Sequence, residues 1–347
     1  MSPAAFVTGG SGFVGGAVVR KLVQEGRDVV ALARSEETAA TVARLGARPV
    51  RGNLFDPASL EDGMRGCDAV FHIAGVSETC ARDPQPMIRA NVEGTRNVIG
   101  AAAGAGVRRL VHTSSAATIG EESGVIGREE TPHRGWFLTA YEASKFEAER
   151  LAFARGRELG IEIVSVNPAS VQGPGRVEGT GRLLLAHLRG HLPVLVDVQL
   201  SLVDLDDCAR GHLLAETRGA PGERYLLCGA TLSVREAVAL LAREAGVRRR
   251  VVYVPPRAVA ALGGPVETAF RAFGRRPPFC RELARALAHG RAYDGSRATR
   301  ELGLDYTPLL ETLRRIVEWF EEAGLLKTAR VGRGRRPPRR RMGSRKR

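Results

Sequence analysis

The chain alternates short apolar runs with stretches of helical periodicity. Ala4–Thr8 is apolar and bounded by turn residues, which predicts a buried parallel strand. Residues 17–24 then carry a helical pattern, and residues 28–33 form a second apolar run. The same alternation continues along the chain. It predicts an α/β protein whose doubly wound parallel sheet is covered by helices on both faces.

A glycine-rich stretch separates the first predicted strand from the first predicted helix. Gly9, Gly12 and Gly15 follow a Gly-x-x-Gly-x-x-Gly spacing, which differs from the commoner Gly-x-Gly-x-x-Gly spacing. Glycines here allow a tight turn, close approach of the backbone to a pyrophosphate and close packing of helix on strand. The helix N-terminus adds free N–H groups and a partial positive charge. Although glycine-rich turns also occur without a ligand, the strand–turn–helix context predicts a dinucleotide site. Its expected contacts are Gly9, Gly10, Ser11, Gly12, Phe13, Val14 and Gly15.

The end of the second predicted strand indicates which dinucleotide binds. An NAD site usually has a carboxylate there for the ribose 2′-hydroxyl, but this chain has Ala33 followed by Arg34. A guanidinium suits a 2′-phosphate because it can donate two charge-assisted hydrogen bonds. We therefore predict NADP(H) as the preferred cofactor. NAD(H) stays possible if Arg34 merely faces solvent.

Tyr141 and Lys145 carry the candidate chemistry. A spacing of four places the phenol and the ammonium on the same face of a helix. A free tyrosine keeps its proton up to about pH 10. A nearby cation is expected to lower that pKa, so that the phenol can exchange a proton near neutrality. The pair alone is a weak signal, because an ordinary helix face with a solvated lysine has the same spacing.

Together with the glycine stretch, this pair makes the chain resemble the extended short-chain dehydrogenase/reductase superfamily (the NAD-dependent epimerase/dehydratase family) over about residues 4–326. Further motifs that carry the resemblance are residues 70–75, 91–98, 110–117, 164–168 and 173–175. A closer similarity, to dihydroflavonol-reductase-like and hopanoid-associated sugar-epimerase-like proteins, rests on residues 89–95, 211–215 and 221–225. The resemblance implies a Rossmann-type fold with a smaller C-terminal substrate lobe.

The resemblance also implies roles for individual residues. Ser115, rather than Ser114, would hydrogen-bond the substrate oxygen, and Tyr141 would exchange its proton. Lys145 would hold the nicotinamide ribose and lower the pKa of Tyr141, while the cofactor carries the hydride. The alternative for Ser115 is a polar strand end that satisfies its own backbone. Besides Tyr141 and Lys145, the cofactor contacts implied are Asn53, Leu54, Ala74, Gly75, Thr113, Pro168 and Ser170.

By the same resemblance, residues 1–168 form the dinucleotide-binding domain, with a returning segment at about 200–228. The substrate lobe comprises residues 169–199 and 229–327. Residues 328–347 hold ten basic residues and no acidic one, so they supply ten of the fourteen net positive charges. We expect this tail to be disordered and to bind polyanions weakly at most, without a specific nucleic-acid partner.

Composition fits a cytoplasmic enzyme. A homodimer is implied only by the habit of the family that the chain resembles. The 347 residues, 44% of them apolar, suffice for one large domain and a smaller lobe. No apolar run reaches 18 residues and no signal-peptide pattern is present, so we expect no transmembrane segment. Five scattered cysteines (67, 80, 208, 228 and 280) predict reduced, packed thiols instead of a disulfide framework or a zinc site. No metal is expected, because Asp207, in the acidic run 204–207, is predicted to cap a helix.

Three features bear on the substrate, and Asn91 bears on the site itself. Nucleotide-sugar epimerases hold a diphosphate with an asparagine and an arginine where this chain has Ser170 and Leu200, which weakens that grip. Residues 136–138 would either offer an apolar wall or pack in the core. Residues 258–273 could cover an apolar substrate, form a plain amphipathic helix or, less expectedly, lie on a membrane surface. Asn91 is expected to cap its helix, the alternative being a water relay.

We therefore expect an NADP(H)-dependent oxidoreductase that reduces a ketone or aldehyde, or oxidises a secondary alcohol, through Ser115, Tyr141 and Lys145. Its partner would be a fairly apolar small molecule. One alternative is a nucleotide-sugar epimerase or dehydratase that recycles its cofactor. Another is a non-catalytic NADP-binding sensor or scaffold, which is disfavoured because the three catalytic residues are all present.

Overall fold

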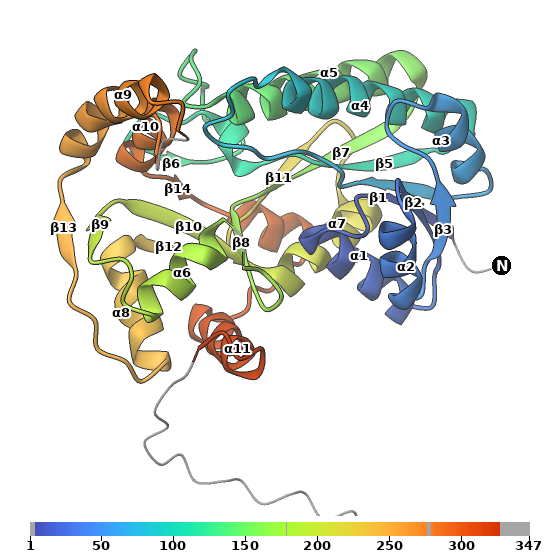
Figure 1. Cartoon of the computed structure of the whole chain (residues 1–347). Helices are drawn as coiled ribbons and strands as arrows, with labels where there is room; N and C mark the ends of the chain where they lie inside the picture. Colours follow the sequence, from blue (N-terminus) through green and yellow to red (C-terminus); the bar gives the residue numbers. More distant parts are fainter. Residues whose placement is uncertain (1–3, 178, 276–278, 327–347) are drawn as a thin grey trace, which may run out of the picture.

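The computed structural model describes residues 4–177, 179–275 and 279–326, and a parallel sheet lies at the centre of its larger lobe (Figure 1). This sheet has seven strands in the order β11-β7-β5-β4-β1-β2-β3, and every neighbouring pair is parallel. Its strands are β1 (Ala4–Thr8), β2 (Asp28–Ala33), β3 (Arg48–Arg51), β4 (Ala69–His72), β5 (Arg109–Thr113), β7 (Glu162–Pro168) and β11 (Arg224–Leu227). The predicted basic tail, residues 328–347, lies outside the described residues.

Helices cover both faces of the large sheet. One face packs against α1 (Phe13–Gln24), α2 (Glu36–Arg44) and α7 (Leu205–Arg218). The other face packs against α3 (Pro57–Met64), α4 (Gln85–Gly104) and α5 (Ala140–Leu159). Burial on both faces explains why the strands are continuous apolar runs without alternation. The predicted α/β fold with a doubly wound parallel sheet is confirmed.

The direction of the sheet's growth reverses beside β1. The chain builds β2 and β3 outward on one side of β1, and β4 then pairs with its other side. Open α/β sheets bind ligands at such a reversal, beyond the carboxyl ends of the strands. The segments after β1 and β4 do meet there, because a Cβ atom added to Gly9 would lie 2.7 Å from the backbone nitrogen of Ala74.

The smaller lobe is built mainly from segments that follow β7. It contains a three-stranded sheet of order β12-β10-β8 and the short parallel pairs β13–β9 and β14–β6. Its strands are β6 (Ile126–Gly127), β8 (Ser170–Gln172), β9 (Val194–Val196), β10 (Gln199–Asp204), β12 (Ala230–Ser233), β13 (Val252–Val254) and β14 (Ala292–Tyr293). Its helices are α6 (Thr180–Leu188), α8 (Val234–Glu244), α9 (Pro256–Ala272), α10 (Arg281–His289) and α11 (Leu309–Glu322). A separate apolar core joins α6, α8 and α11.

Two turns of other helical types complete the described chain. A 3-10 turn spans Ala116–Ile119 directly after β5, and a π-helical turn spans Ala298–Leu302. None of the helices in the described ranges combines the length and apolar character that a membrane span requires. In the same ranges, no group of histidine, cysteine, aspartate and glutamate side chains is arranged to hold a metal ion.

The start of α7 differs from the prediction. Asp204, and not Asp207, is the N-cap, because the Asp204 side chain accepts a hydrogen bond from the Asp206 backbone N–H at 2.8 Å. Asp207 instead accepts from the backbone N–H of Thr307 at 2.6 Å and from its hydroxyl at 2.9 Å. Asp207 therefore joins α7 to the segment before α11.

The expectation that all five cysteines are reduced is wrong for two of them. Cys80, between β4 and α4, forms a disulfide with Cys280, the N-cap of α10. The other three cysteines are free and buried. Because 200 residues separate the two partners, no local spacing indicated their pairing. The bond fastens the smaller lobe, at the start of α10, to the segment that follows β4.

Candidate active site

The glycine-rich stretch forms the turn between β1 and α1. Gly9 has a φ of 74°, a left-handed conformation that favours glycine, and its carbonyl accepts a hydrogen bond from the Gly12 backbone N–H at 2.9 Å. A Cβ atom at Gly15 would overlap that same carbonyl oxygen. Gly12 starts α1 without a side-chain cap, so no side chain competes for the first N–H groups of the helix. This cradle suits the pyrophosphate of a dinucleotide.

The residues predicted for the adenosine end lie after β2 and β3. Arg34 directly follows β2 and is exposed, and no ion pair within the described ranges involves it. Asn53 is exposed too, and its side-chain oxygen accepts from the Phe55 backbone N–H at 2.7 Å. The Leu54 carbonyl accepts from the Asn97 side-chain amide at 2.9 Å, which ties this loop to α4.

Lys145 is the point where three elements of the site meet. Its side-chain nitrogen donates a hydrogen bond at 2.6 Å to the carbonyl of Thr113, the last residue of β5. The same nitrogen lies beside Gly75, since a Cβ atom added there would be 3.7 Å from it. Lys145 is only 5% exposed, and burial lowers its pKa to about 8, although the charge of Glu149 raises it.

Tyr141 lies one turn earlier on α5, and the hydroxyl of Ser115 hydrogen-bonds its phenol. Ser115 is the N-cap of the turn after β5, where it also accepts from the Ala117 backbone N–H at 3.3 Å. Ser114 is buried, and its hydroxyl has no partner within the described residues. The three predicted catalytic residues therefore gather at the carboxyl end of β5.

The expectation that Lys145 lowers the pKa of Tyr141 is wrong, because Lys145 is not among the groups that shift this pKa. Burial raises the pKa of Tyr141, and this outweighs the lowering by the Ser115 hydrogen bond and by the charges of Arg291 and Arg176. The spacing of four correctly suggested a shared helix face, but it carried no information about how deeply the phenol is buried.

The two arginines near Tyr141 were not among the predicted site residues. Arg291 lies just before β14 in the smaller lobe, 149 residues along the chain from its ion-pair partner Glu142, so no local pattern pointed to it. The guanidinium carbon of Arg176 lies 5.4 Å from the ring centroid of Phe13, at the start of α1. Arg176 directly follows the glycine-proline-glycine turn after β8, a position that could have indicated it.

The start of α5 is held by contacts from outside the large sheet. Thr139 caps the helix, since its hydroxyl accepts from the Glu142 backbone N–H at 3.1 Å. The buried carboxylate of Glu142 pairs with Arg134 and, at 3.1 Å, with Arg291. The Ala140 backbone N–H donates to the carboxylate of Glu282 in α10 at 2.8 Å. The smaller lobe thus positions the turn of helix that carries Tyr141.

Asn91 does not cap a helix, contrary to expectation. It lies inside α4, and its side chain accepts from the Val76 backbone N–H at 2.8 Å. The amide donates to the Val76 carbonyl and to the Ser144 hydroxyl, both at 2.9 Å. Asn91 therefore fixes the segment after β4, which includes Ala74 and Gly75, against α5.

The remaining predicted residues line the side of the smaller lobe. Pro168 ends β7, and Ser170 begins β8, where its hydroxyl lies 3.1 Å from that of Thr180. Trp136 and Phe137 are 46% and 36% exposed, whereas Leu138 is buried. Of the segment 136–138, only Leu138 packs in the core, and the two aromatic side chains stay accessible.

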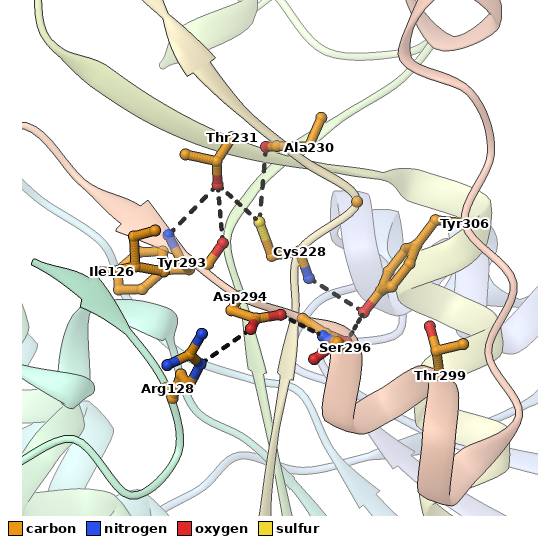
Figure 2. Close-up of a pocket in the computed structure, with 12 residues that line it drawn as sticks. Ile126, Arg128, Cys228, Ala230, Thr231, Tyr293, Asp294, Ser296, Thr299 and Tyr306 are labelled. Atoms are coloured by element: carbon orange, nitrogen blue, oxygen red, sulfur yellow. Dashed lines mark hydrogen bonds and ion pairs between the residues drawn. The ribbon is translucent and has the colours of Figure 1, made fainter.

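A cavity of about 430 Å³ lies apart from this site, lined by residues of β6, β12 and β14 and of the segment after β11 (Figure 2). None of the predicted site residues lines it. Figure 2 shows that its polar groups already bond one another: Arg128 pairs with Asp294 at 3.0 Å, and the Thr231 hydroxyl donates to the Tyr293 carbonyl at 2.9 Å. Nothing in the cavity indicates a ligand, so the candidate active site is the one at β5.

Comparison with known proteins agrees with this choice. A family model, the NAD dependent epimerase/dehydratase family, matches residues 5–228. A protein named dihydroflavonol 4-reductase from Synechocystis sp. is 34% identical and covers 94% of this chain and 97% of its own length. Sterol demethylase protein B of Methylococcus capsulatus is 32% identical, with coverages of 92% and 99%. A 4-hydroxy-2-methyl-3-oxo-4-farnesyl-3,4-dihydroquinoline-1-oxide ketoreductase of Stigmatella aurantiaca is 34% identical, with coverages of 86% and 90%.

Solved structures show the same likeness. The crystal structure of gox2253 matches with a TM-score of 0.84 and 32% identity, covering 94% of this chain and all of that one. DesIV, a dTDP-glucose 4,6-dehydratase from Streptomyces venezuelae solved with NAD and TYD bound, matches with a TM-score of 0.74 and 25% identity, with coverages of 92% and 97%.

The buried amine of Lys145 leads to a prediction about stability. Its pKa falls from 10.5 to about 8 on folding. Below pH 8 both the folded and the unfolded states hold the proton, so folding bears the full cost of burying the charge. Between pH 8 and 10.5 the unfolded state binds more protons, so stability rises with pH. Lys145→Met should therefore raise the free energy of unfolding at pH 7 by up to about 3 kcal/mol, and by progressively less toward pH 10.5.

Urea denaturation at several pH values measures this difference. Lys21→Met, on the half-exposed flank of α1, is the matched control and should show no comparable gain at pH 7. A Lys145→Met variant that is less stable than the wild type at pH 7, or a difference that does not change with pH, would contradict the prediction.

Proposed function

Because the chain belongs to the NAD dependent epimerase/dehydratase family, we propose that it uses NADP(H) to reduce a fairly apolar ketone or aldehyde, or to oxidise the corresponding secondary alcohol. Several relatives are named reductases and one is named a dehydrogenase, and the protein is an NAD(P)-dependent oxidoreductase. The proposed reaction is supported above all by one observation: Ser115, Tyr141 and Lys145 lie together at the carboxyl end of β5. A cytoplasmic location stays a prediction from composition, and a homodimer stays one from the resemblance.

The residues predicted to bind the cofactor suit a dinucleotide. The turn at residues 9–15 would take the pyrophosphate, because only glycine fits where Gly9 meets Ala74 and Gly15 meets Gly9. Arg34, Asn53 and Leu54 would hold the adenosine end. Lys145, next to Gly75 and Thr113, would hold the nicotinamide ribose, with Ala74, Pro168 and Ser170 as further contacts. When bound, the nicotinamide supplies or accepts the hydride.

The raised pKa of Tyr141 suits a proton donor. In the direction of reduction, the carbonyl carbon gains a hydride while its oxygen takes the phenol proton, and solvent later returns a proton to the phenolate. The Ser115 hydroxyl, which bonds the phenol, would bond the substrate oxygen as well. The charges of Arg291 and Arg176 lower the pKa of Tyr141, so they stabilise the phenolate once it forms.

An apolar substrate is favoured by the chain's own residues and by its relatives' names. Ser170 and Leu200 replace two groups that bind a sugar diphosphate, and Trp136 and Phe137 expose apolar surface. Two relatives are named for a sterol and for a farnesylated quinoline. A nucleotide-sugar epimerase or dehydratase is the second candidate, because the DesIV dehydratase shares the fold at 25% identity. Such an enzyme would keep its cofactor bound and show no net consumption of NADPH.

Tyr141→Phe tests the proposed chemistry. Removing the proton donor should lower kcat by roughly 10²–10⁴-fold in an NADPH absorbance assay with a panel of apolar ketones. The Kd for NADPH, measured by fluorescence titration, should stay nearly the same because the ring remains. Tyr253→Phe, on β13, is the matched control and should keep full activity. Activity retained by Tyr141→Phe would remove the tyrosine from the mechanism.

Arg34→Ala tests the proposed cofactor preference. Loss of the guanidinium should weaken NADPH binding by about tenfold or more while leaving NADH binding unchanged, since only NADPH carries the 2′-phosphate. Isothermal titration with both cofactors gives the two affinities. Arg44→Ala, exposed on the neighbouring α2, is the control. The preference for NADP(H) is wrong if the wild type binds NADH more tightly, or if the variant's selectivity does not change.

A further inference from the structure

Helix α9 lies at the periphery of the smaller lobe (Figure 1). Three large apolar side chains on this helix and its C-cap are exposed: Leu262 by 54%, Phe270 by 37% and Phe273 by 81%. Large apolar side chains gathered on one exposed element need an explanation, because single ones are ordinary but patches mark interaction sites.

The packing of α9 shows which face is free. α9 lies against α10 through Gly263, where an added Cβ atom would collide with Ala284. The Glu267 carboxylate, one turn further along, accepts from the Arg281 backbone N–H at 2.9 Å. At 100° per residue, the residues of α9 and its C-cap that fall within one stripe of about 100°, away from Glu267, are all apolar. They are Ala258, Leu262, Pro265, Val266, Ala269 and Phe273, which we call the α9 face, and all of them except Val266 are exposed.

The α9–α10 pair is fixed to the catalytic helix. The disulfide of Cys280 holds the start of α10 to the larger lobe, and Glu282 bonds the Ala140 backbone N–H next to Tyr141. The α9 face is therefore part of a rigid arrangement, and only α10 separates α9 from the first turn of α5.

Exposed arginines lie on α9, on α10 and in the residues just after α9. Arg257, Arg275, Arg281 and Arg285 are exposed on this pair of helices, and no carboxylate within the described residues pairs with any of them. The one carboxylate on α9, Glu267, already pairs with Arg271 at 2.6 Å. In addition, residues 328–347 carry ten basic residues and no acidic one. The surface thus combines an apolar patch with an excess of positive charge.

This combination favours one kind of partner. A second copy of the chain docked symmetrically on the same face would bring two arginine-rich surfaces together, and like charges repel. An anionic lipid bilayer instead offers apolar chains for the patch and phosphates for the arginines. A basic terminal segment strengthens such binding, because stable attachment to a membrane surface usually needs two signals.

We propose that the α9 face docks the protein on the surface of an anionic lipid bilayer, with Leu262 and Phe273 inserted at the boundary between headgroups and acyl chains. The exposed arginines contact lipid phosphates. This docking does not depend on the reaction proposed above.

Co-sedimentation of the full chain with vesicles tests the proposal. Vesicles of phosphatidylcholine with phosphatidylglycerol should bind the wild type, and binding should weaken as salt is added. Vesicles of phosphatidylcholine alone should bind much less. The double variant Leu262→Ser, Phe273→Ser should bind the anionic vesicles about tenfold or more weakly, because the salt-independent apolar contribution is lost.

The matched control is Val125→Ser, Leu310→Ser, which removes two exposed apolar side chains elsewhere and should bind like the wild type. Circular dichroism shows whether each variant is folded, and exposed positions such as these should tolerate serine.

The proposal is overturned if the wild type does not bind anionic vesicles. It is also overturned if the α9 variant binds them equally well, which would assign binding to residues 328–347. A self-association that the α9 variant abolishes, without vesicle binding by the wild type, would assign the face to a second copy.

Discussion

The hydrogen bond from the Lys145 amine to the Thr113 carbonyl is the contact on which the rest of the site depends. It joins the catalytic helix to the carboxyl end of β5 and places the amine beside Gly75, in the turn after β4. With that contact made, helical spacing puts Tyr141 next to Ser115. The contact has a cost, since burial drives the amine toward its neutral form and lowers its pKa to about 8. A costly buried cation at a ligand crevice is typical of a functional site.

The second constraint on the chemistry comes from the smaller lobe. Glu142 pairs with Arg291, and Glu282 bonds the first backbone N–H of α5, so the start of the catalytic helix is built jointly by both lobes. The pKa of Tyr141 follows from this arrangement: burial raises it, and Arg291 is one of the charges that lower it. Sequence change in the smaller lobe can therefore alter proton transfer as well as substrate choice.

Local patterns predicted the parts of the molecule that local physics determines. The fold followed from the alternation of apolar runs and helical stretches, and the glycine turn followed from the positions where only glycine fits. The gathering of Ser115, Tyr141 and Lys145 was expected from spacing and from the resemblance. The features that were predicted wrongly or missed depend on long-range contacts. The partner of Cys80 is 200 residues away, and Arg291 reaches Glu142 across 149 residues. Asn91 bonds Val76 and Ser144 from inside a helix, so no capping pattern applied to it.

The central claim is that this site passes a hydride from the cofactor to a carbonyl carbon and releases both products. The direct measurement uses NADPH deuterated at the reactive position of its nicotinamide, with an apolar ketone that the protein reduces, and mass spectrometry of the alcohol. The account predicts one deuterium on the carbinol carbon for each NADPH oxidised. An alcohol without deuterium, or a label that stays on a bound and recycled cofactor, would contradict it.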